Sequence, residues 1–194
     1  MMNELKNKDN LRQSSRAKRN RFGDEYIRCA SEHACDLILK TREFASAKTI
    51  LIYYPIKNEI SPLPLMEKAL QMGKSVAFPV CDKENRMLIF KKAIGLSELK
   101  EADFGLLEPN ERCSTVTPDE NTLCIVPALL FSRDGYRLGY GGGYYDRFLK
   151  NFNGISAGLC YDELLCDFLP HEMHDIQLDM IISDCEVLYI VKKN

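Results

Sequence analysis

Thr49-Ile-Leu-Ile-Tyr-Tyr54 decides the fold class of this chain, because nothing in it is charged and most of it is β-branched or aromatic. Such a continuous run is typical of a strand that is covered on both faces, whereas a half-exposed strand alternates polar and apolar residues. Strands covered on both faces belong to parallel sheets that lie between layers of helices. The stretch therefore predicts helices before and after it along the chain.

The segments that flank this strand have the patterns of helices. Upstream, residues 24–48 carry an apolar stripe at helical spacing, made of Ile27, Ala30, Ala34, Leu37 and Ile38. Downstream, Ser61 is placed to cap a helix that has Pro62 at its first position and ends at Gly73. Further out, the patterns predict one more helix at residues 144–150 and strands at residues 75–79, 87–90, 123–126, 155–159, 180–182 and 187–191.

This alternation predicts an α/β fold, namely a single three-layer α/β/α domain over residues 1–194 with a largely parallel sheet. A chain of 194 residues fits one domain. Ligands of such sheets bind beyond the carboxyl ends of the strands. Glu59 follows the first strand, a glycine-rich segment follows a later one, and Asp175 lies in a loop after the fifth. We therefore expect these three features to share one rim of the sheet.

The composition excludes several classes of protein. A net charge of −2 argues against a general nucleic-acid binder, which is usually strongly basic. The eight cysteines contain no Cys-x-x-Cys pair, which structural zinc sites usually need. The N-terminus is charged and lacks an apolar signal core, and no apolar run approaches the ~20 residues that span a bilayer. We expect a cytoplasmic protein with reduced thiols and no nucleic-acid or membrane partner.

Gly135-Tyr-Arg-Leu-Gly-Tyr-Gly-Gly-Gly-Tyr-Tyr-Asp146 is the segment with the clearest chemistry, since it holds five of the 11 glycines. Clustered glycines let backbone N–H groups approach an anion closely. Arg137 offers a cation for phosphate, and Asp146 offers a hard oxygen ligand for a metal. From glycine content alone, a mobile lid or a plain turn is an equally good interpretation. Tyr144 stands where the Walker and dinucleotide patterns need other residues, so neither fits.

The basic N-terminal segment is a second candidate. Lys8, Arg12, Arg16 and Arg19 follow a spacing that places them along one helical stripe. Taken alone, the stripe favours a solvated helix face. Asp146 taken alone is equally well explained as an acid in the first turn of a helix.

Several elements together resemble the 5-formyltetrahydrofolate cyclo-ligase (methenyltetrahydrofolate synthetase) family. The most specific is the glycine-rich segment, continued as Arg-Phe-Leu149 and preceded by Pro127-Ala-Leu-Leu-Phe131. The others are Lys8-Asp-Asn-Leu-Arg12, Glu59-Ile60, and Pro170-His-Glu-Met-His-Asp175 with Leu178-Asp179. The likeness covers nearly the whole chain in the right order.

The resemblance implies a compact three-layer α/β domain that converts 5-formyltetrahydrofolate and ATP to 5,10-methenyltetrahydrofolate, ADP and phosphate with Mg²⁺. It assigns ATP binding to Lys8, Asp9, Asn10, Leu11, Arg12, Arg137, Leu138, Gly139, Tyr140, Gly141, Gly142, Gly143, Tyr144 and Tyr145. It assigns folate binding to Arg12, Tyr54, Glu59, Tyr140 and Tyr144. The magnesium ligands implied are Asp146 and Asp175.

This chain departs from the family pattern at two places. Tyr140 and Gly142 stand where relatives often place a lysine or arginine, and Glu163 stands where they often have glutamine. Phosphate neutralisation is therefore expected to depend on Lys8, Arg12 and Arg137. The alternatives are a phosphotransferase or ATPase acting on another small molecule, and a non-enzymatic nucleotide- or RNA-binding module. Either way, we expect a monomer.

Overall fold

An eight-stranded sheet forms the centre of the computed structural model, which describes residues 2–192. Its strand order is β13-β12-β10-β7-β1-β2-β3-β6. The five central strands are parallel: β12 (Met180–Ile182), β10 (Ile155–Leu159), β7 (Thr122–Val126), β1 (Thr49–Leu51) and β2 (Ser75–Asp82). Three antiparallel strands complete the two sides: β13 (Val187–Tyr189), β3 (Met87–Lys92) and β6 (Thr115–Val116). The predicted α/β class with a mostly parallel sheet is confirmed.

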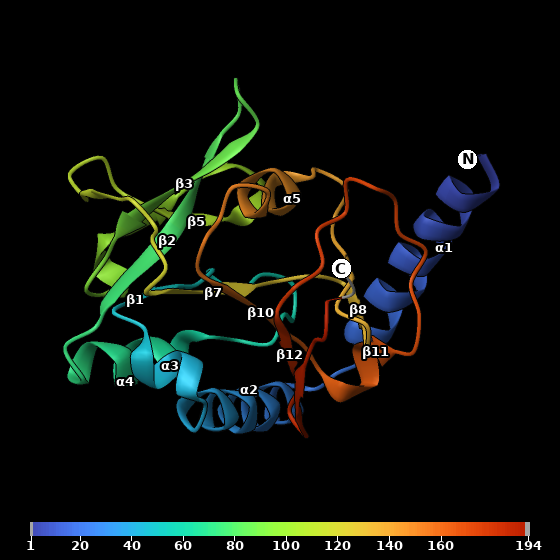
Figure 1. The fold of residues 1–194 in the computed structure, drawn as a ribbon, viewed down its shortest axis with the longest axis horizontal. Helices are drawn as coiled ribbons and strands as arrows, with labels where there is room; N and C mark the ends of the chain where they lie inside the picture. The colour runs from blue at the N-terminus through green and yellow to red at the C-terminus, as the bar shows by residue number, and fades with distance from the viewer. Residues whose placement is uncertain (1, 193–194) are drawn as a thin grey trace.

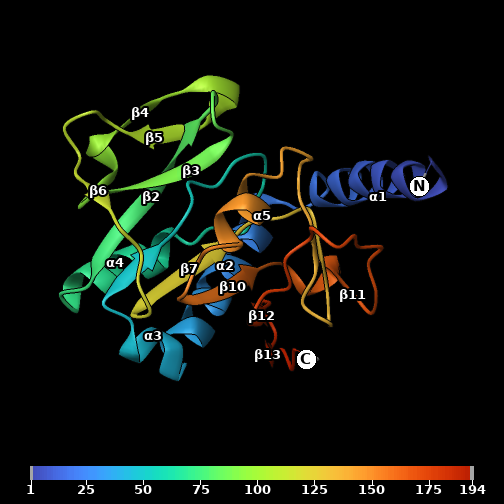
Figure 2. The same cartoon turned by 45° about the horizontal axis from the view of Figure 1, so that its top comes forward.

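The sheet is covered on both faces, as the opening strand predicts. Alternate residues of β1 serve different cores: Ile50 packs on one face and Leu51 on the other, and both are fully buried. One face carries α2 (Asp24–Leu39), α3 (Arg42–Ser46) and α4 (Leu63–Gln71), and the other carries α5 (Tyr144–Leu149) (Figures 1 and 2). Strand β1 is shorter than predicted. Its last hydrogen bond to β2 is the one from the Ile52 N–H to the Ala77 carbonyl at 2.9 Å, and beyond Ile52 the chain leaves the sheet.

Local capping moves two helix boundaries from their predicted places. The helix predicted over residues 24–48 is broken at Thr41, whose Oγ1 accepts from the Phe44 N–H at 3.1 Å and so starts α3. The following helix has Pro62 as its N-cap instead of Ser61, whose hydroxyl accepts from the Leu63 N–H at 3.2 Å. Its end is as predicted, since Gly73 has φ +76°.

Helix α1 (Met2–Arg19) lies at one end of the molecule, outside the layers that sandwich the sheet (Figures 1 and 2). Near it is a small sheet of order β11-β8-β9, made of Leu165–Cys166, Leu130–Ser132 and Arg137–Leu138. Between residues 7 and 19 the only apolar side chains of the helix are Leu11 and Ala17. The helix therefore contacts the rest of the molecule mainly through polar groups.

The remaining elements are short. Strands β4 (Leu99–Glu101) and β5 (Leu107–Pro109) pair with each other, and three 3-10 turns cover Leu96–Glu98, Asp103–Gly105 and Asp162–Leu164. Among residues 2–192, no helix is both long and apolar enough to cross a bilayer.

Candidate active site

The glycine-rich loop, residues 139–143, connects β9 to α5 in a conformation that side chains would disturb. Gly141 and Gly143 have φ of +102° and +66°, in the left-handed region that favours glycine. A Cβ on Gly142 would lie 2.9 Å from the Tyr144 ring, and one on Gly143 would lie 2.8 Å from Arg147. Gly141, Gly142 and Gly143 therefore have a local backbone or steric reason to be glycine.

Helix α1 lies against this loop and leaves a hollow between them. The Arg12 Nε donates to the Gly139 carbonyl at 3.1 Å, and its Nη1 donates to Asp9 at 2.6 Å. The hollow has a volume of about 520 Å³ and is lined by Asp9, Arg12, Gln13, Arg16, Tyr140 and Gly141. Its size lies in the range of small-molecule sites, and its cations suit an anionic ligand.

Glu59 lies at the carboxyl end of β1, in a tight loop. Its N–H donates to the Ile56 carbonyl at 3.0 Å, and its own Oε2 accepts from the Ile56 N–H at 3.0 Å. Lys57 and Asn58, between them, have φ of 47° and 60°, which are uncommon for residues other than glycine. Such strain often occurs at functional sites, where it fixes one side chain in place.

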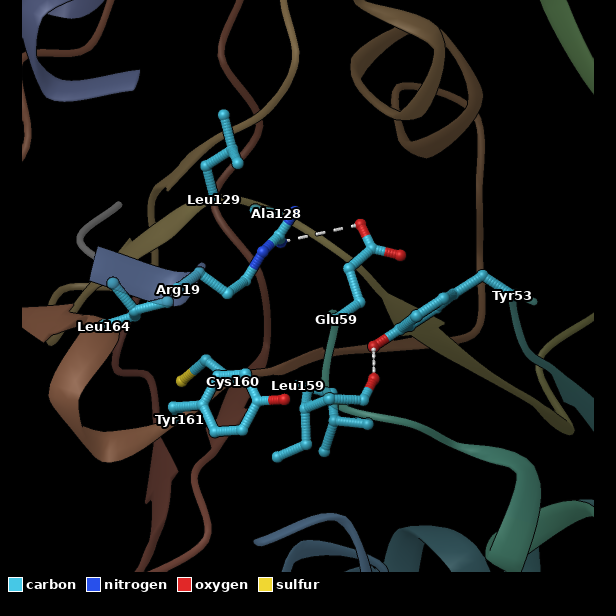
Figure 3. A pocket seen from close by; sticks show the side chains of 10 residues that line it. Arg19, Tyr53, Glu59, Ala128, Leu129, Leu159, Cys160, Tyr161 and Leu164 are labelled. Atoms are coloured by element: carbon cyan, nitrogen blue, oxygen red, sulfur yellow. Dashed lines mark hydrogen bonds and ion pairs between the residues drawn. The ribbon is translucent and has the colours of Figure 1, made fainter. Parts of the chain in front are cut away.

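The Glu59 carboxylate is buried beside Tyr140, a predicted site residue, and Arg19, a residue of the basic stripe. Tyr140 donates its hydroxyl hydrogen to Glu59 Oε1, and Arg19 Nη2 donates to the Tyr140 hydroxyl at 2.7 Å. Arg19 Nη1 lies 3.8 Å from Glu59 Oε1 across a small cavity (Figure 3). Burial raises the pKa of Glu59, and the hydrogen bonds from Tyr140 and Ile56 and the Arg19 charge only partly offset it.

The cavity beside Glu59 is small, about 10 Å³, which is enough for a single water molecule. Tyr53 lines it and donates its hydroxyl to the Ile60 carbonyl at 2.6 Å. Tyr54, predicted for the folate pocket, does not line it and packs half-buried against the core on the α2 face. Of the predicted folate residues, Tyr140 bonds to Glu59 and lines the hollow together with Arg12.

Asp146 and Arg137 form an ion pair, although the sequence analysis assigned Asp146 to the metal and Arg137 to phosphate. Arg137 Nη2 donates to Asp146 Oδ1 at 2.6 Å, and Nη1 donates to the Ile176 carbonyl at 2.9 Å. The Arg137 side chain is only 4% exposed, and burial lowers its pKa against the opposing effect of Asp146. Arg137 thus neutralises Asp146 and does not line the hollow.

Asp175 lies on the segment that contacts Asp146, since the N–H of the next residue, Ile176, donates to Asp146 Oδ1 at 3.3 Å. Lys8 of helix α1 donates to Asp175 Oδ2 at 2.8 Å and to Glu172 at 3.2 Å. Burial opposes the charge of Asp175, but Lys8 and the Glu172 N–H outweigh it and lower the pKa of Asp175. Burial also opposes the charge of Lys8, but the two acids outweigh it and raise the pKa of Lys8.

These two carboxylates fit magnesium better than a metal that needs a full protein cage. Within the described residues, no group of three or more His, Cys, Asp or Glu side chains is arranged to hold a metal. Mg²⁺ usually takes one or two carboxylates and completes its shell with water and phosphate oxygens. Asp146 and Asp175, on segments joined by the Ile176 N–H contact, match that donor set.

The other predicted ATP residues have varied surroundings. Asn10 is exposed and Leu11 is half-buried on helix α1, whereas Leu138 is buried in the core. Tyr145 packs into the core on the α5 face, and its buried hydroxyl has no hydrogen-bond partner among the described residues. Tyr144 packs against the same core, and the Arg147 guanidinium lies 5.3 Å from the centre of its ring.

Two residues of the site were missed by sequence reasoning. Arg19 belonged to the basic stripe, so its spacing from Lys8 and Arg12 was a usable signal, but it was given no role. Tyr53 had no signal that distinguishes it from Tyr54. Glu163, which departs from the family pattern, pairs with Lys18 of helix α1 at 3.1 Å.

Comparison with known proteins agrees with this geometry. The family model described as "5-formyltetrahydrofolate cyclo-ligase family" matches residues 4–184. A 5-formyltetrahydrofolate cyclo-ligase of Haemophilus influenzae is 33% identical over 159 residues, which cover 79% of this chain and 83% of that protein.

Two solved structures have the same fold. The 5,10-methenyltetrahydrofolate synthetase of Aquifex aeolicus superposes with a TM-score of 0.82 at 30% identity, covering 96% of this chain and 94% of that one. The corresponding synthetase of Mycoplasma pneumoniae has a TM-score of 0.74 at 26% identity, covering 91% and 98%. The family predicted from the sequence is thus confirmed, and the chain belongs to the 5-formyltetrahydrofolate cyclo-ligase family.

Proposed function

We propose that this enzyme converts 5-formyltetrahydrofolate and ATP to 5,10-methenyltetrahydrofolate, ADP and phosphate in a magnesium-dependent reaction. The observation that carries the proposal is the meeting of three chain segments at one end of the sheet. Arg12 of helix α1 bonds to the glycine-rich loop, and Tyr140 of that loop bonds to Glu59 after β1. An anion site and a site for a polar heterocycle are therefore adjacent, as a reaction between ATP and a folate requires.

The chemistry explains why both ligands must be held side by side. A formamide oxygen is a very poor leaving group. Transfer of the γ-phosphoryl group of ATP to that oxygen, with release of ADP, converts it into a phosphate, which leaves readily. N10 of the folate then attacks the formyl carbon, the carbon–oxygen bond breaks, and phosphate leaves as the five-membered ring closes. Such a transfer needs mainly positioning and neutralisation of charge from the protein.

The residues of the hollow suit that task. Arg12 and Arg16 line it together with Gly141 of the glycine-rich loop, so two cations and a glycine backbone are available to a polyphosphate. Asp146 and Asp175 would hold Mg²⁺, which supplies neutralisation of the phosphate oxygens when bound. Lys8, bonded to Asp175, is close enough to this group to add a further cation.

Glu59 and Tyr140 would bind the folate, with the carboxylate accepting hydrogen bonds from the pterin. This assignment separates the proposal from that of a general ATPase, because ATP hydrolysis alone needs no site for a heterocycle beside the nucleotide. A further part of the proposal is a single domain that works as a monomer in the cytoplasm. The eight free cysteines support the compartment, because thiols stay reduced in the cytoplasm.

The test is to mix the purified protein with 5-formyltetrahydrofolate, ATP and Mg²⁺ and to follow the absorbance of methenyltetrahydrofolate. We expect product only when all three are present, with one ADP formed for each ring closed. Folded protein that hydrolyses ATP at the same rate with and without the folate, and makes no methenyl product, would contradict the proposal.

A further inference from the structure

Arg19 is a buried cation that the reaction outlined above does not use. The residue is 2% exposed, and its guanidinium faces the cavity beside Glu59 (Figure 3). Among the residues that the structure describes, its one hydrogen bond to a side chain runs from Nη2 to the Tyr140 hydroxyl. Within the described residues, its Nε is a buried donor without a partner. A buried charged donor left unpaired is costly, so this arrangement needs an explanation.

A purely structural ion pair with Glu59 does not provide one. Structural guanidinium–carboxylate pairs are typically bidentate, with distances of about 2.7–2.9 Å. Here the closest approach of Arg19 to Glu59 is 3.8 Å, and the Tyr140 hydroxyl bonds to both side chains. The Arg19 and Glu59 side chains thus lie side by side and face the same cavity. The Tyr140 hydroxyl that is hydrogen-bonded to both could be replaced by a ligand.

A phosphate does not suit this space either. The Glu59 carboxylate would repel it at close range, and the rest of the lining is largely apolar, with Tyr53, Ala128, Leu129, Leu159 and Leu164. A carboxylate next to a guanidinium offers, in spatial order, two hydrogen-bond acceptor oxygens and then N–H donors. The matching ligand is a flat, uncharged heterocycle whose edge presents two donors followed by one acceptor.

We infer, on the basis of the proposed function, that Arg19 is a specificity-determining residue that binds the 4-oxo oxygen of the pterin while Glu59 binds its 2-amino group and N3–H. These three groups lie next to one another along one edge of the pterin ring, in the order that the pair requires. The cavity of about 10 Å³ is too small for a ring edge. The edge enters when Tyr140, which is 38% exposed, moves away from the two charged groups.

The experiment compares two ligands with two protein variants in the absence of ATP. The ligands are 5-formyltetrahydrofolate and its 4-amino analogue, which presents a donor in place of the 4-oxo acceptor. The variants are Arg19→Gln and, as a matched control, Arg21→Gln, which removes the same charge from an exposed residue two positions away. Affinity is measured by calorimetry, and folding by near-UV circular dichroism and thermal unfolding.

We expect Arg19→Gln to weaken binding of 5-formyltetrahydrofolate by about 10- to 100-fold, the usual cost of a lost hydrogen bond from a charged group. It should weaken binding of the 4-amino analogue much less, so that the ratio of the affinities for the 4-oxo and 4-amino ligands becomes smaller. The KM for ATP should change by less than about threefold. Arg21→Gln should leave both affinities unchanged.

Equal loss of affinity for both ligands, or no loss, would overturn the inference. If Arg19→Gln does not fold, Arg19→Lys takes its place: it keeps the charge, and it must still narrow the preference because it loses the planar donor pair. Failure of the proposed function is a separate result, since the wild-type protein would then form no methenyl product whatever the variants bind.

Discussion

At the scale of single residues, Asp146 has the most closely defined surroundings of the predicted ligands. It lies in the first turn of α5, where Arg137 and the Ile176 N–H both donate to its Oδ1. The side chain is 25% exposed, so the protein does not fully enclose its oxygens. This combination of a fixed orientation and an accessible oxygen is what a metal ligand requires.

Asp146→Asn should reduce kcat by about 100-fold or more, because the variant loses the negative charge that holds the metal. Folding should persist, since the amide oxygen can still accept from Arg137. The measurement is turnover over a range of Mg²⁺ concentrations, with thermal unfolding as the control for folding. An unchanged magnesium dependence would remove Asp146 from the metal site.

Glu59 gives a prediction about pH and stability. Its pKa is raised in the folded protein, above the ordinary value of 4.5, because burial disfavours its charged form. Its favourable contribution to stability is therefore complete below pH 4.5 and is lost as pH rises through the raised pKa. Glu59→Gln, which cannot ionise, should gain stability relative to the wild type as pH increases over this window.

Urea unfolding of both proteins between about pH 4 and pH 8 tests this prediction through the difference in unfolding free energy. Glu101→Gln, at an exposed position, is the control and should show no comparable trend. A difference for Glu59→Gln that stays constant with pH would mean that burial does not disfavour the carboxylate.

At the scale of elements, helix α1 shows what a sequence pattern can and cannot predict. The spacing of its basic residues predicted one stripe, and a solvated face was the favoured interpretation when the helix was considered alone. In the structure, Lys8 and Arg19 are buried at 7% and 2% exposure, and Arg16 is exposed. The partners of the buried pair come from residues far along the chain, so no local pattern could identify them.

Lys8→Ala should raise the KM for ATP by about 10-fold or more while changing the KM for the folate by less than about threefold. The reason is that Lys8 bonds to Asp175, on the proposed metal and nucleotide side, and has no contact with Glu59. Steady-state kinetics with each substrate varied in turn give the two values.

Lys18→Ala is the matched control for this variant, because Lys18 lies on the same helix and pairs with Glu163, away from Asp175. It should leave the KM for ATP nearly unchanged. A larger effect of Lys8→Ala on the folate than on ATP would contradict the assignment of Lys8 to the nucleotide side.

The central strands and the ends of α4 and α5 were largely predictable, because continuous apolar runs and glycine stops are local signals. The break at Thr41 was not recognised, since it depends on one hydroxyl capping one N–H. The small sheet of β8, β9 and β11 escaped prediction because strands of two or three residues have no periodicity. The pairing of Arg137 with Asp146 depends on tertiary geometry.

At the scale of the whole molecule, Gly158 shows how closely the small sheet packs on the large one. Gly158 lies in β10, and a Cβ there would overlap the Phe131 ring of β8 and lie 2.8 Å from Ile181 Cδ1. These neighbours are fully buried and cannot move freely. The glycine therefore allows the two sheets to approach each other.

Gly158→Ala should lower the free energy of unfolding by about 1–3 kcal/mol, the usual cost of overpacking a core. Urea unfolding measures the change, with Gly95→Ala as the control, because the nearest atom to a Cβ at Gly95 is 3.8 Å away. Equal stability of the two variants would show that Phe131 can move at little cost.

The polar attachment of helix α1 has a consequence for how the enzyme responds to its solution. Apolar packing holds the sheet and its helices, whereas charged side chains hold α1, and dissolved salt weakens exposed contacts such as the Lys18–Glu163 pair far more than apolar packing. Raising the ionic strength should therefore reduce the affinity for ATP well before it affects the urea midpoint. Unfolding and loss of nucleotide binding would then be separate events in one small protein.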